Sequence, residues 1–177
     1  MIIRSRAPLR ISFAGGGTDV DPYPQIKGGA VLSTSIDRYA YTTIKNSDKN
    51  IILKSQDYNL TQRFNNFSDF SYDGKLDLVK AAIKDFNLDK PLQCITHVDA
   101  PPGSGLGSSS AVAVSLIGSL SYFYNQNFSN YEIAEKAYDI ERVELGIKGG
   151  RQDQYASVFG GFNFIFDHEK YTFFKIQ

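Results

Sequence analysis

The sequence predicts one α+β domain over residues 1–177, in which helices cover one face of a mixed sheet. Short runs rich in β-branched and aromatic residues indicate strands, and apolar residues at three- to four-residue spacing indicate helices. No repeat, low-complexity tract or linker interrupts the order of these elements. With 177 residues, 42% of them hydrophobic, the chain can bury a packed core without disulfides.

The first half of the chain is dominated by strand patterns. Apolar residues alternate with Arg10 and Ser12 over Leu9–Phe13, and this strand stops at three glycines, residues 15–17. Four more short segments, separated by Asp, Asn and Ser clusters, are expected to form antiparallel strands. They are Ala30–Ser35, Tyr39–Lys45, Ile51–Lys54 and Asn59–Phe64.

The second half alternates helices with strands. A long helix should start near Ser108, and the capping-box pattern S-x-x-E at Ser129 should open a helix that runs to about Leu145. The other expected elements are a helix over 76–86, a strand over Leu92–Val98, a short helix over Gln152–Phe159, and strands over Phe162–Phe166 and Tyr171–Ile176.

Charge and composition narrow the classes of function. Lys plus Arg and Asp plus Glu both number 19, so there is no basic surplus to attract nucleic acid or anionic lipid. The sequence has neither an apolar run long enough to span a membrane nor the apolar region of a signal peptide. The single Cys94 cannot form an internal disulfide and is expected to be a core side chain. We therefore expect a cytoplasmic protein that binds neither nucleic acid nor membrane.

A glycine- and serine-rich segment between a predicted strand and a predicted helix is the strongest local signal. Its residues are Pro102, Gly103, Ser104, Gly105, Leu106, Gly107, Ser108, Ser109 and Ser110. Glycines let the backbone approach an anion and the helix start offers unpaired N–H groups, so the segment predicts a phosphate-binding loop. A serine oxygen there can also bind Mg²⁺. The spacing fits neither G-x-x-x-x-G-K-[ST] nor G-x-G-x-x-G, and a plain glycine turn with a serine-capped helix is the alternative.

A second glycine-rich turn follows the first predicted strand. Gly16 and Gly17 are followed by Thr18 and Asp19, which place a hydroxyl and a carboxylate on the turn. Such groups are suited to hydrogen bonds with the hydroxyls of a polyol. The alternative is that Thr18 and Asp19 only close the turn.

Two glutamates lie near the buried stripe of the helix opened at Ser129. At about 100° per residue, Glu144 falls inside the stripe and Glu141 at its edge. Because an ionised carboxylate is costly in a dry core, such a glutamate needs a cation, a metal or a cleft to face. The alternative is a solvated glutamate that pairs with Arg142 or Lys136.

A glycine pair precedes the short helix over Gln152–Phe159 and places Asp153 in its first turn. The positive end of the helix favours the ionised carboxylate, which can orient or deprotonate an attacking hydroxyl. The alternative is an aspartate that serves only the helix start. His97 and His168 have no ligand-like spacing, and we assign them no role.

In this order, the segments resemble the GHMP kinases, a class that includes galactokinase, homoserine kinase and mevalonate kinase. Residues 101–111 resemble the P-x-x-x-G-L-G-S-S-A nucleotide loop of the class, and Pro8-Leu9-Arg10 with residues 15–19 resembles its substrate-side motif. The Gly-Gly-Gly-Thr-Asp variant, with residues 149–155 and 159–163, is most similar to the bacterial D-glycero-D-manno-heptose 7-phosphate 1-kinases. The resemblance covers nearly the whole chain.

The resemblance implies a ribosomal-protein-S5-domain-2-like fold and transfer of the ATP γ-phosphoryl group, with Mg²⁺, to the anomeric hydroxyl of a sugar phosphate. Asp153 takes the position of the catalytic aspartate and Arg10 that of the basic residue near the transferred phosphoryl group. Ser109 and Glu141 take the positions of the magnesium ligands, with Glu144 as the alternative to Glu141. Residues 102–110 then bind ATP, and the substrate-binding residues are Gly16, Gly17, Thr18, Asp19, Gly150 and Gln152.

Two alternatives stay open. One is another sugar kinase of the class, similar to galactokinase or fucokinase, and the other is a non-catalytic S5-like module that binds RNA or senses a sugar. Zero net charge and the presence of Arg10, Ser109 and Asp153 argue against the second. The class also carries a glycine-rich motif in a C-terminal ferredoxin-like domain that this sequence does not contain. We therefore expect an N-terminal half whose exposed apolar surface favours self-association.

Overall fold

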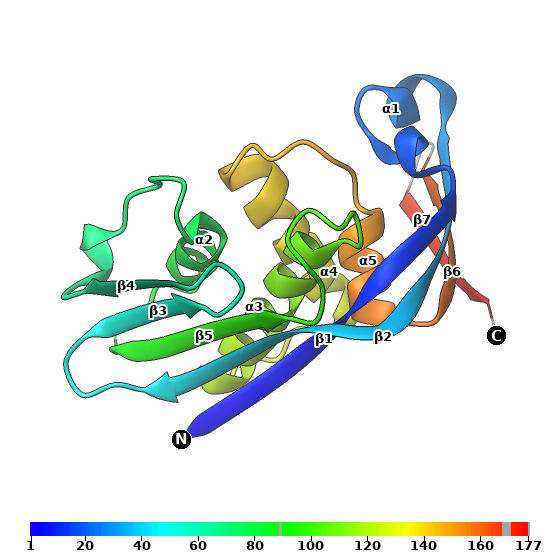
Figure 1. The fold of residues 1–177 in the computed structure, drawn as a ribbon. Helices are drawn as coiled ribbons and strands as arrows, with labels where there is room; N and C mark the ends of the chain where they lie inside the picture. Colours follow the sequence, from blue (N-terminus) through cyan, green and yellow to red (C-terminus); the bar gives the residue numbers. More distant parts are fainter. Residues whose placement is uncertain (89, 168–170, 177) are drawn as a thin grey trace.

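In the computed structural model, which describes residues 1–88, 90–167 and 171–176, the strands join one seven-stranded mixed sheet (Figure 1). They are β1 (Ile2–Ala14), β2 (Gly29–Asn46), β3 (Ile51–Ser55), β4 (Leu60–Phe64), β5 (Leu92–Val98), β6 (Phe162–Asp167) and β7 (Tyr171–Ile176). The order is β4-β3-β5-β2-β6-β7, with β1 paired to β2. The sheet is mixed because β3 runs parallel to β5, whereas the sequence predicted only antiparallel neighbours for this segment. The crossover that carries helix α2 makes the parallel pairing possible.

The long strand β2 replaces the two short strands expected over 30–35 and 39–45. Residues 36–38 include neither glycine nor proline, and β1 pairs with β2 on both sides of them. A register shift between Pro8 and Arg10 lets β1 follow the whole strand, so β1 is also longer than the predicted segment from Leu9 to Phe13. Along its other edge β2 pairs first with β6 and then with β5. One continuous strand therefore joins both ends of the sheet.

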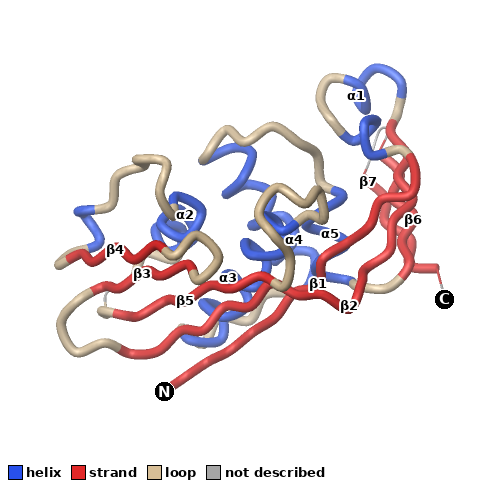
Figure 2. The backbone as a smooth tube through the Cα atoms, in the orientation of Figure 1, coloured by secondary structure: helices blue, strands red, loops and turns tan. Residues whose placement is uncertain are grey.

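The helices are η1 (Gly16–Asp19), α1 (Tyr23–Lys27), η2 (Phe67–Asp69), α2 (Asp77–Asp85), α3 (Ser108–Phe123), α4 (Asn130–Tyr138), the π-helix η3 (Asp139–Glu144) and α5 (Gln152–Phe159). Figure 2 shows α2 at the β3–β4 end of the sheet and α5 near β1, with α3 and α4 between them. The predicted starts of α3 and α5 are confirmed. So is the capping box, in which the Glu132 N–H donates to Ser129 Oγ and the Ser129 N–H to Glu132. Across the ranges that the structure describes, none of the helices is long and apolar enough to cross a membrane.

The helices cover one face of the sheet, as the sequence predicted. On β1, Ala7 and Leu9 are buried on the side that α3 contacts, whereas Arg4 and Arg6 are exposed on the other side. Exposed aromatic side chains also lie on β1 and β6, where the rings of Phe13 and Phe162 have centroids 5.7 Å apart. The outer face is therefore partly apolar, as expected.

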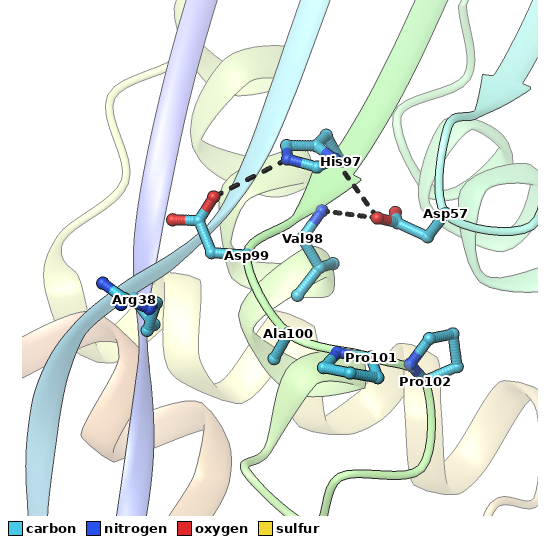
Figure 3. Close-up of a pocket in the computed structure, with 8 residues that line it drawn as sticks. All are labelled: Arg38, Asp57, His97, Val98, Asp99, Ala100, Pro101 and Pro102. Atoms are coloured by element: carbon cyan, nitrogen blue, oxygen red, sulfur yellow. Dashed lines mark hydrogen bonds and ion pairs between the residues drawn. The ribbon is translucent and has the colours of Figure 1, made fainter.

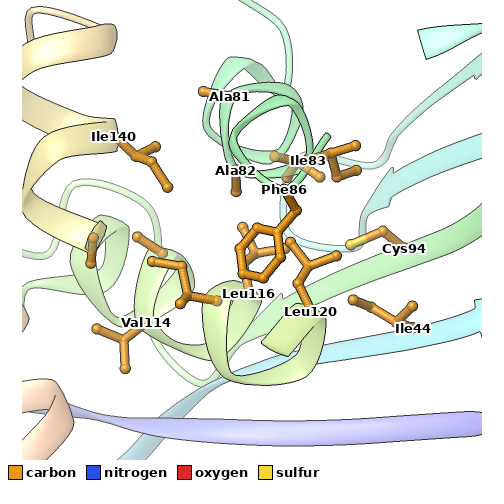
Figure 4. Packing of buried hydrophobic residues seen from close by; sticks show 14 of the residues in the cluster. Ile44, Ala81, Ala82, Ile83, Phe86, Cys94, Val114, Leu116, Leu120 and Ile140 are labelled. Carbon is orange, nitrogen blue, oxygen red and sulfur yellow. The ribbon is translucent and has the colours of Figure 1, made fainter. Parts of the chain in front are cut away.

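The core is formed where α2 and α3 pack together against the sheet (Figure 4). Ile83 of α2 and Phe86, which directly follows α2, meet Leu116 and Leu120 of α3, and all four are buried. Truncation of such a leucine to alanine typically costs about 2–5 kcal/mol. Cys94 lies in the same cluster, and burial raises the pKa of its thiol to about 12, so it is the inert core side chain that the sequence predicted.

Candidate active site

The segment between β5 and α3 forms an open loop. Gly103, Gly105 and Gly107 have φ angles of +77°, +73° and +71°, a region that residues with a side chain rarely adopt. Among the described residues, no heavy atom lies within 4 Å of a Cβ placed on Gly103 or Gly105. The loop therefore has free space beside its backbone, next to the first turn of α3, whose N–H groups lack acceptors within the helix.

A cavity of about 630 Å³ lies against this loop, a size typical of small-ligand sites. Eight of the predicted site residues line it: Arg10, Pro102, Gly103, Gly105, Gly107, Ser108, Ser109 and Asp153. Ser104 is exposed, Ser110 is buried, and the Leu106 side chain packs against the core. The loop is anchored to β1 because the Arg10 N–H donates to the Leu106 carbonyl at 3.0 Å.

Arg10 and Asp153 form an ion pair at the edge of this cavity. Arg10 Nε donates to Asp153 Oδ1 at 2.7 Å, and Arg10 also donates to the Gly105 carbonyl at 2.6 Å. Their side chains are 11% and 19% exposed, so both still reach the cavity. Asp153 lies in the first turn of α5, as predicted. Three segments far apart in the sequence thus place a cation and a carboxylate beside the loop over 102–110, which the sequence predicted to bind phosphate; we call it the phosphate loop.

Glu141 of η3 lies against the start of α3 and is fully buried. Ser109 donates to one of its carboxylate oxygens at 2.6 Å, and Ser110 and Gln154 each donate to the other at 2.6 Å. These three neutral donors offset the desolvation of a buried carboxylate. Side chains from α3 and α5 therefore meet at the Glu141 carboxylate, which η3 carries.

The helical-wheel expectation that Glu144 is the more buried of the two glutamates is wrong. Residues 139–144 form a π-helix, whose wider turn changes the angle per residue, so the 100° wheel fails there. Glu144 is exposed and accepts a hydrogen bond from Tyr72 Oη at 2.5 Å. Partial burial, together with this hydrogen bond, raises the pKa of Tyr72.

The second glycine turn packs against the start of α5. The carboxylate of Asp19, which is 3% exposed, accepts a hydrogen bond from the Gln152 N–H at 2.8 Å. A Cβ on Gly150 would lie 1.7 Å from the Asp19 carbonyl oxygen, so only glycine fits there. The Gln152 side chain donates to the Gly16 carbonyl at 3.3 Å. The turn over 16–19 therefore lies against Gly150 and Gln152, which are close to Asp153 in sequence.

Thr18 closes this turn. Its hydroxyl donates to the Gly15 carbonyl at 2.7 Å and accepts from the Ala30 N–H at 3.0 Å. This is the turn-closing role that the sequence left open as an alternative. Gly17 borders the same turn, and no described heavy atom lies within 4 Å of a Cβ placed on it.

Ser12 is a polar residue of the site that sequence reasoning did not select. Ser12 Oγ and Gln152 Oε1 are both buried and, within the described part of the chain, have no hydrogen-bond partner. Both lie beside Gly16, at 3.3 Å and 3.7 Å from a Cβ placed on that glycine. The available signal was that Arg10 and Ser12 share one face of the same strand.

An open hollow of about 630 Å³ adjoins the cavity and contains His97 (Figure 3). His97 lies between two carboxylates, with Nδ1 at 3.2 Å from Asp57 and Nε2 at 3.6 Å from Asp99. Asp57 also accepts from the Val98 N–H at 3.0 Å. Among the described residues, no group of three His, Cys, Asp or Glu side chains is arranged to hold a metal. His168 lies outside the described residues.

Comparison with known proteins identifies the family. Residues 77–161, which include the phosphate loop, Glu141 and Asp153, match the GHMP kinases N-terminal domain. These residues form a GHMP kinase N-terminal domain. A D-glycero-alpha-D-manno-heptose 7-phosphate kinase from Campylobacter jejuni is 45% identical over 92% of this chain. A galactokinase from Thermotoga petrophila is 26% identical over 89% of the chain.

Solved structures of GHMP kinases confirm the predicted fold. A D-glycero-D-manno-heptose 1-phosphate kinase from Bacteroides thetaiotaomicron superposes on the whole chain with a TM-score of 0.91 and 37% sequence identity. This chain covers 60% of that structure, 50% of the Campylobacter kinase and 44% of the galactokinase. It thus spans about half the length of the curated relatives that it matches.

Proposed function

We propose that this chain is the ATP-binding and phosphoryl-transfer half of a kinase for D-glycero-D-manno-heptose 7-phosphate, acting at O-1 in heptose nucleotide and surface polysaccharide biosynthesis. The observation that carries the proposal is the Arg10–Asp153 pair, which faces the cavity beside the open phosphate loop. The relatives at 45% and 37% identity are named heptose phosphate kinases, which favours this acceptor over galactose.

The phosphate loop binds the ATP phosphates through its backbone. Gly103 and Gly105 leave the space that a triphosphate needs, and the first turn of α3 adds N–H donors and a partial positive charge. Arg10 lies next to this loop and meets the negative charge that develops during transfer. The site thus positions the γ-phosphoryl group without a lysine in the loop.

Asp153 orients the acceptor and takes its proton. The anomeric hydroxyl donates its hydrogen to the Asp153 carboxylate while its oxygen attacks the γ-phosphorus. The bond from the γ-phosphorus to the bridging oxygen breaks and ADP leaves. Arg10 holds the carboxylate in place through the 2.7 Å hydrogen bond. Asp153 then releases the proton to solvent.

The donor set around Glu141 fits Mg²⁺. Ser109 Oγ and a Glu141 oxygen lie 2.6 Å apart, and Mg²⁺ in kinases usually takes one or two protein oxygens together with substrate phosphates. Mg²⁺, when bound, neutralises charge on the phosphates. Ser110 and Gln154 hold the other carboxylate oxygen, so they keep Glu141 aimed at Ser109.

The sugar phosphate is expected to lie at the second glycine turn, over residues 16–19. Asp19 and Thr18 make hydrogen bonds within the protein, and the carbonyls of Gly16 and Gly150 accept from Gln152 and Arg142. The groups best placed for sugar hydroxyls are therefore Gln152 Oε1 and the backbone of Gly17. Cytoplasmic location and self-association through the exposed aromatic face remain part of the proposal.

The test is product analysis with the full-length protein, ATP and Mg²⁺. Heptose 7-phosphate, heptose 1-phosphate, galactose and L-fucose are offered separately, and ³¹P NMR locates the new phosphate. We expect an anomeric phosphate from heptose 7-phosphate alone. Asp153→Asn should lower kcat by about 10²–10⁴ because a positioned base contributes on that scale, while ATP affinity changes little.

Asp48→Asn, at an exposed loop position, is the matched control and should leave kcat unchanged. Turnover of Asp153→Asn within a few-fold of wild type would remove Asp153 from the mechanism. Faster phosphorylation of galactose or L-fucose would replace the proposed acceptor.

A further inference from the structure

A buried lysine on α2 has no role in the transfer step described above. The Lys80 side chain is 1% exposed and its ammonium group has three acceptors. They are the Ser71 carbonyl at 2.8 Å, Asp73 at 2.5 Å and Asp77 at 3.2 Å. Removing a lysine from water is costly, and only the complete set of acceptors offsets that cost. Two of the acceptors come from the segment that leads into α2, and Asp77 is the first residue of the helix.

The two carboxylates in turn hold the backbone of this segment. Asp77 accepts from the N–H groups of Asp73 and Gly74 at 3.2 Å and 2.8 Å, and Asp73 accepts from the Lys75 N–H at 3.1 Å. The hydrogen bond from Lys80 lowers the pKa of Asp73 to about 2, so this carboxylate stays ionised over the physiological range. One ammonium group therefore organises the whole turn over residues 73–77.

This turn is a wall of the cavity. Residues 74–79 line it together with Gly103 and Gly105 of the phosphate loop. The turn lies at the β3–β4 end of the sheet, and β5 and β2 separate that end from β1, which carries Arg10 (Figure 1). If the phosphates occupy the Arg10 end, the wall over 74–79 faces the nucleoside.

Resting on the ATP site of the proposed function, we infer that Lys80 is a positioning residue for the nucleotide. Its ammonium group fixes the turn over 73–77 as the nucleoside-side wall, so it sets the affinity for ATP and not the rate of phosphoryl transfer. The Tyr72–Glu144 hydrogen bond ties the same segment to the helix that carries Glu141.

The experiment measures ATP binding by calorimetry and steady-state kinetics in the full-length protein. Lys80→Met keeps the apolar stem and removes the ammonium group. We expect the Kd and the KM for ATP to rise about tenfold while kcat stays within about threefold, because the lost interaction holds the nucleotide equally before and during transfer. Amide exchange at Gly74 and Lys75 should become faster.

Lys136→Met is the matched control, since Lys136 pairs with Asp85 at 2.6 Å but does not line the cavity. It should leave the Kd for ATP unchanged. Asp73→Asn covers the case in which Lys80→Met does not fold, because Asp73 is 41% exposed. It should weaken ATP binding in the same direction and speed exchange at Lys75.

Equal ATP affinity in wild type and either folded variant would overturn the role of Lys80 and leave the proposed function intact. A fall in kcat with an unchanged KM would overturn it as well. Wild type that binds no ATP would instead contradict the proposed function, and this inference would fall with it.

Discussion

Two glycine-rich turns lie near the same site, and their glycines are needed for opposite reasons. In the phosphate loop, a Cβ on Gly103 or Gly105 would meet nothing within 4 Å among the described residues. In the second turn, a Cβ on Gly15 would lie 1.7 Å from the Ala30 carbonyl oxygen. At the start of α5, which packs against this turn, a Cβ on Gly150 would lie 1.7 Å from the Asp19 carbonyl oxygen. The first group leaves room for a ligand, and the second group lets the protein pack against itself.

The comparison shows that glycine content alone does not identify a binding site. Both segments combine glycines with hydroxyl residues and precede a helix. Only the three-dimensional surroundings distinguish them. Thr18 and Asp19 make hydrogen bonds within the protein and do not line the cavity, whereas Ser109 donates to Glu141 and also lines the cavity. Substitutions in the two turns should therefore affect different quantities.

Gly150→Ala should give the largest loss of stability. The added methyl group would overlap the Asp19 backbone and separate Asp19 from the Gln152 N–H. We expect the free energy of unfolding to fall by about 3 kcal/mol or more, at the upper end of overpacking effects. Urea unfolding measures it. Gly17→Ala, which has open space, is the control and should change stability by less than about 0.5 kcal/mol. Equal losses in both variants would show that the close contact with Asp19 is not what requires glycine at position 150.

Substitutions of the adjacent serines Ser109 and Ser110 should also affect different quantities, ATP binding in one case and stability in the other. Ser110→Ala removes a donor from the buried Glu141 carboxylate and should cost about 1–3 kcal/mol of stability. Ser109→Ala should cost less stability, because Ser109 reaches the cavity, but it should weaken binding of ATP in the presence of Mg²⁺. Thermal unfolding and calorimetry give the two quantities. A Ser110→Ala protein as stable as wild type would show that Glu141 does not need this donor.

Thr18→Val should give a smaller effect confined to stability. The substitution keeps the shape and removes a hydroxyl that bonds Gly15 and Ala30, which should cost about 1 kcal/mol. Thr18→Ser should restore most of it. A large rise in the KM for the sugar phosphate, with unchanged stability, would instead show that Thr18 contacts the substrate.

Local patterns predicted much of this fold. The starts of α3 and α5 and the full extent of β5 follow from glycine breaks and from periodicity, which are properties of neighbouring residues. The continuity of β2 depends on β1 as a partner along its length, and no local pattern carries that information. The five-residue helix α1 is too short to show a period.

The site likewise contains residues that the sequence predicted and residues whose placement it could not predict. Asp153 was a candidate from its place in the first turn of a predicted helix, whereas the role of Arg10 came from the motif resemblance, and the structure brings the two side chains to 2.7 Å. The burial of Glu141 could not be predicted from a helical wheel, because the π-helix changes the phase. The burial of Lys80 could not be predicted from the sequence, since a lysine among apolar residues of a helix normally lies at the surface.

Calorimetric titration of ATP and Mg²⁺ into wild type, Gly105→Val and Gly146→Val tests directly whether the backbone of the phosphate loop binds ATP. Both glycines have positive φ angles and open surroundings among the described residues, so both variants should lose a similar 1–2 kcal/mol of stability, roughly the strain of a left-handed residue. Only Gly105 lies in the phosphate loop. We predict that wild type and Gly146→Val bind ATP alike and that Gly105→Val binds about 30-fold more weakly, a difference of about 2 kcal/mol. Equal affinity in all three proteins, or no binding to wild type, would show that this loop is not the ATP-binding site.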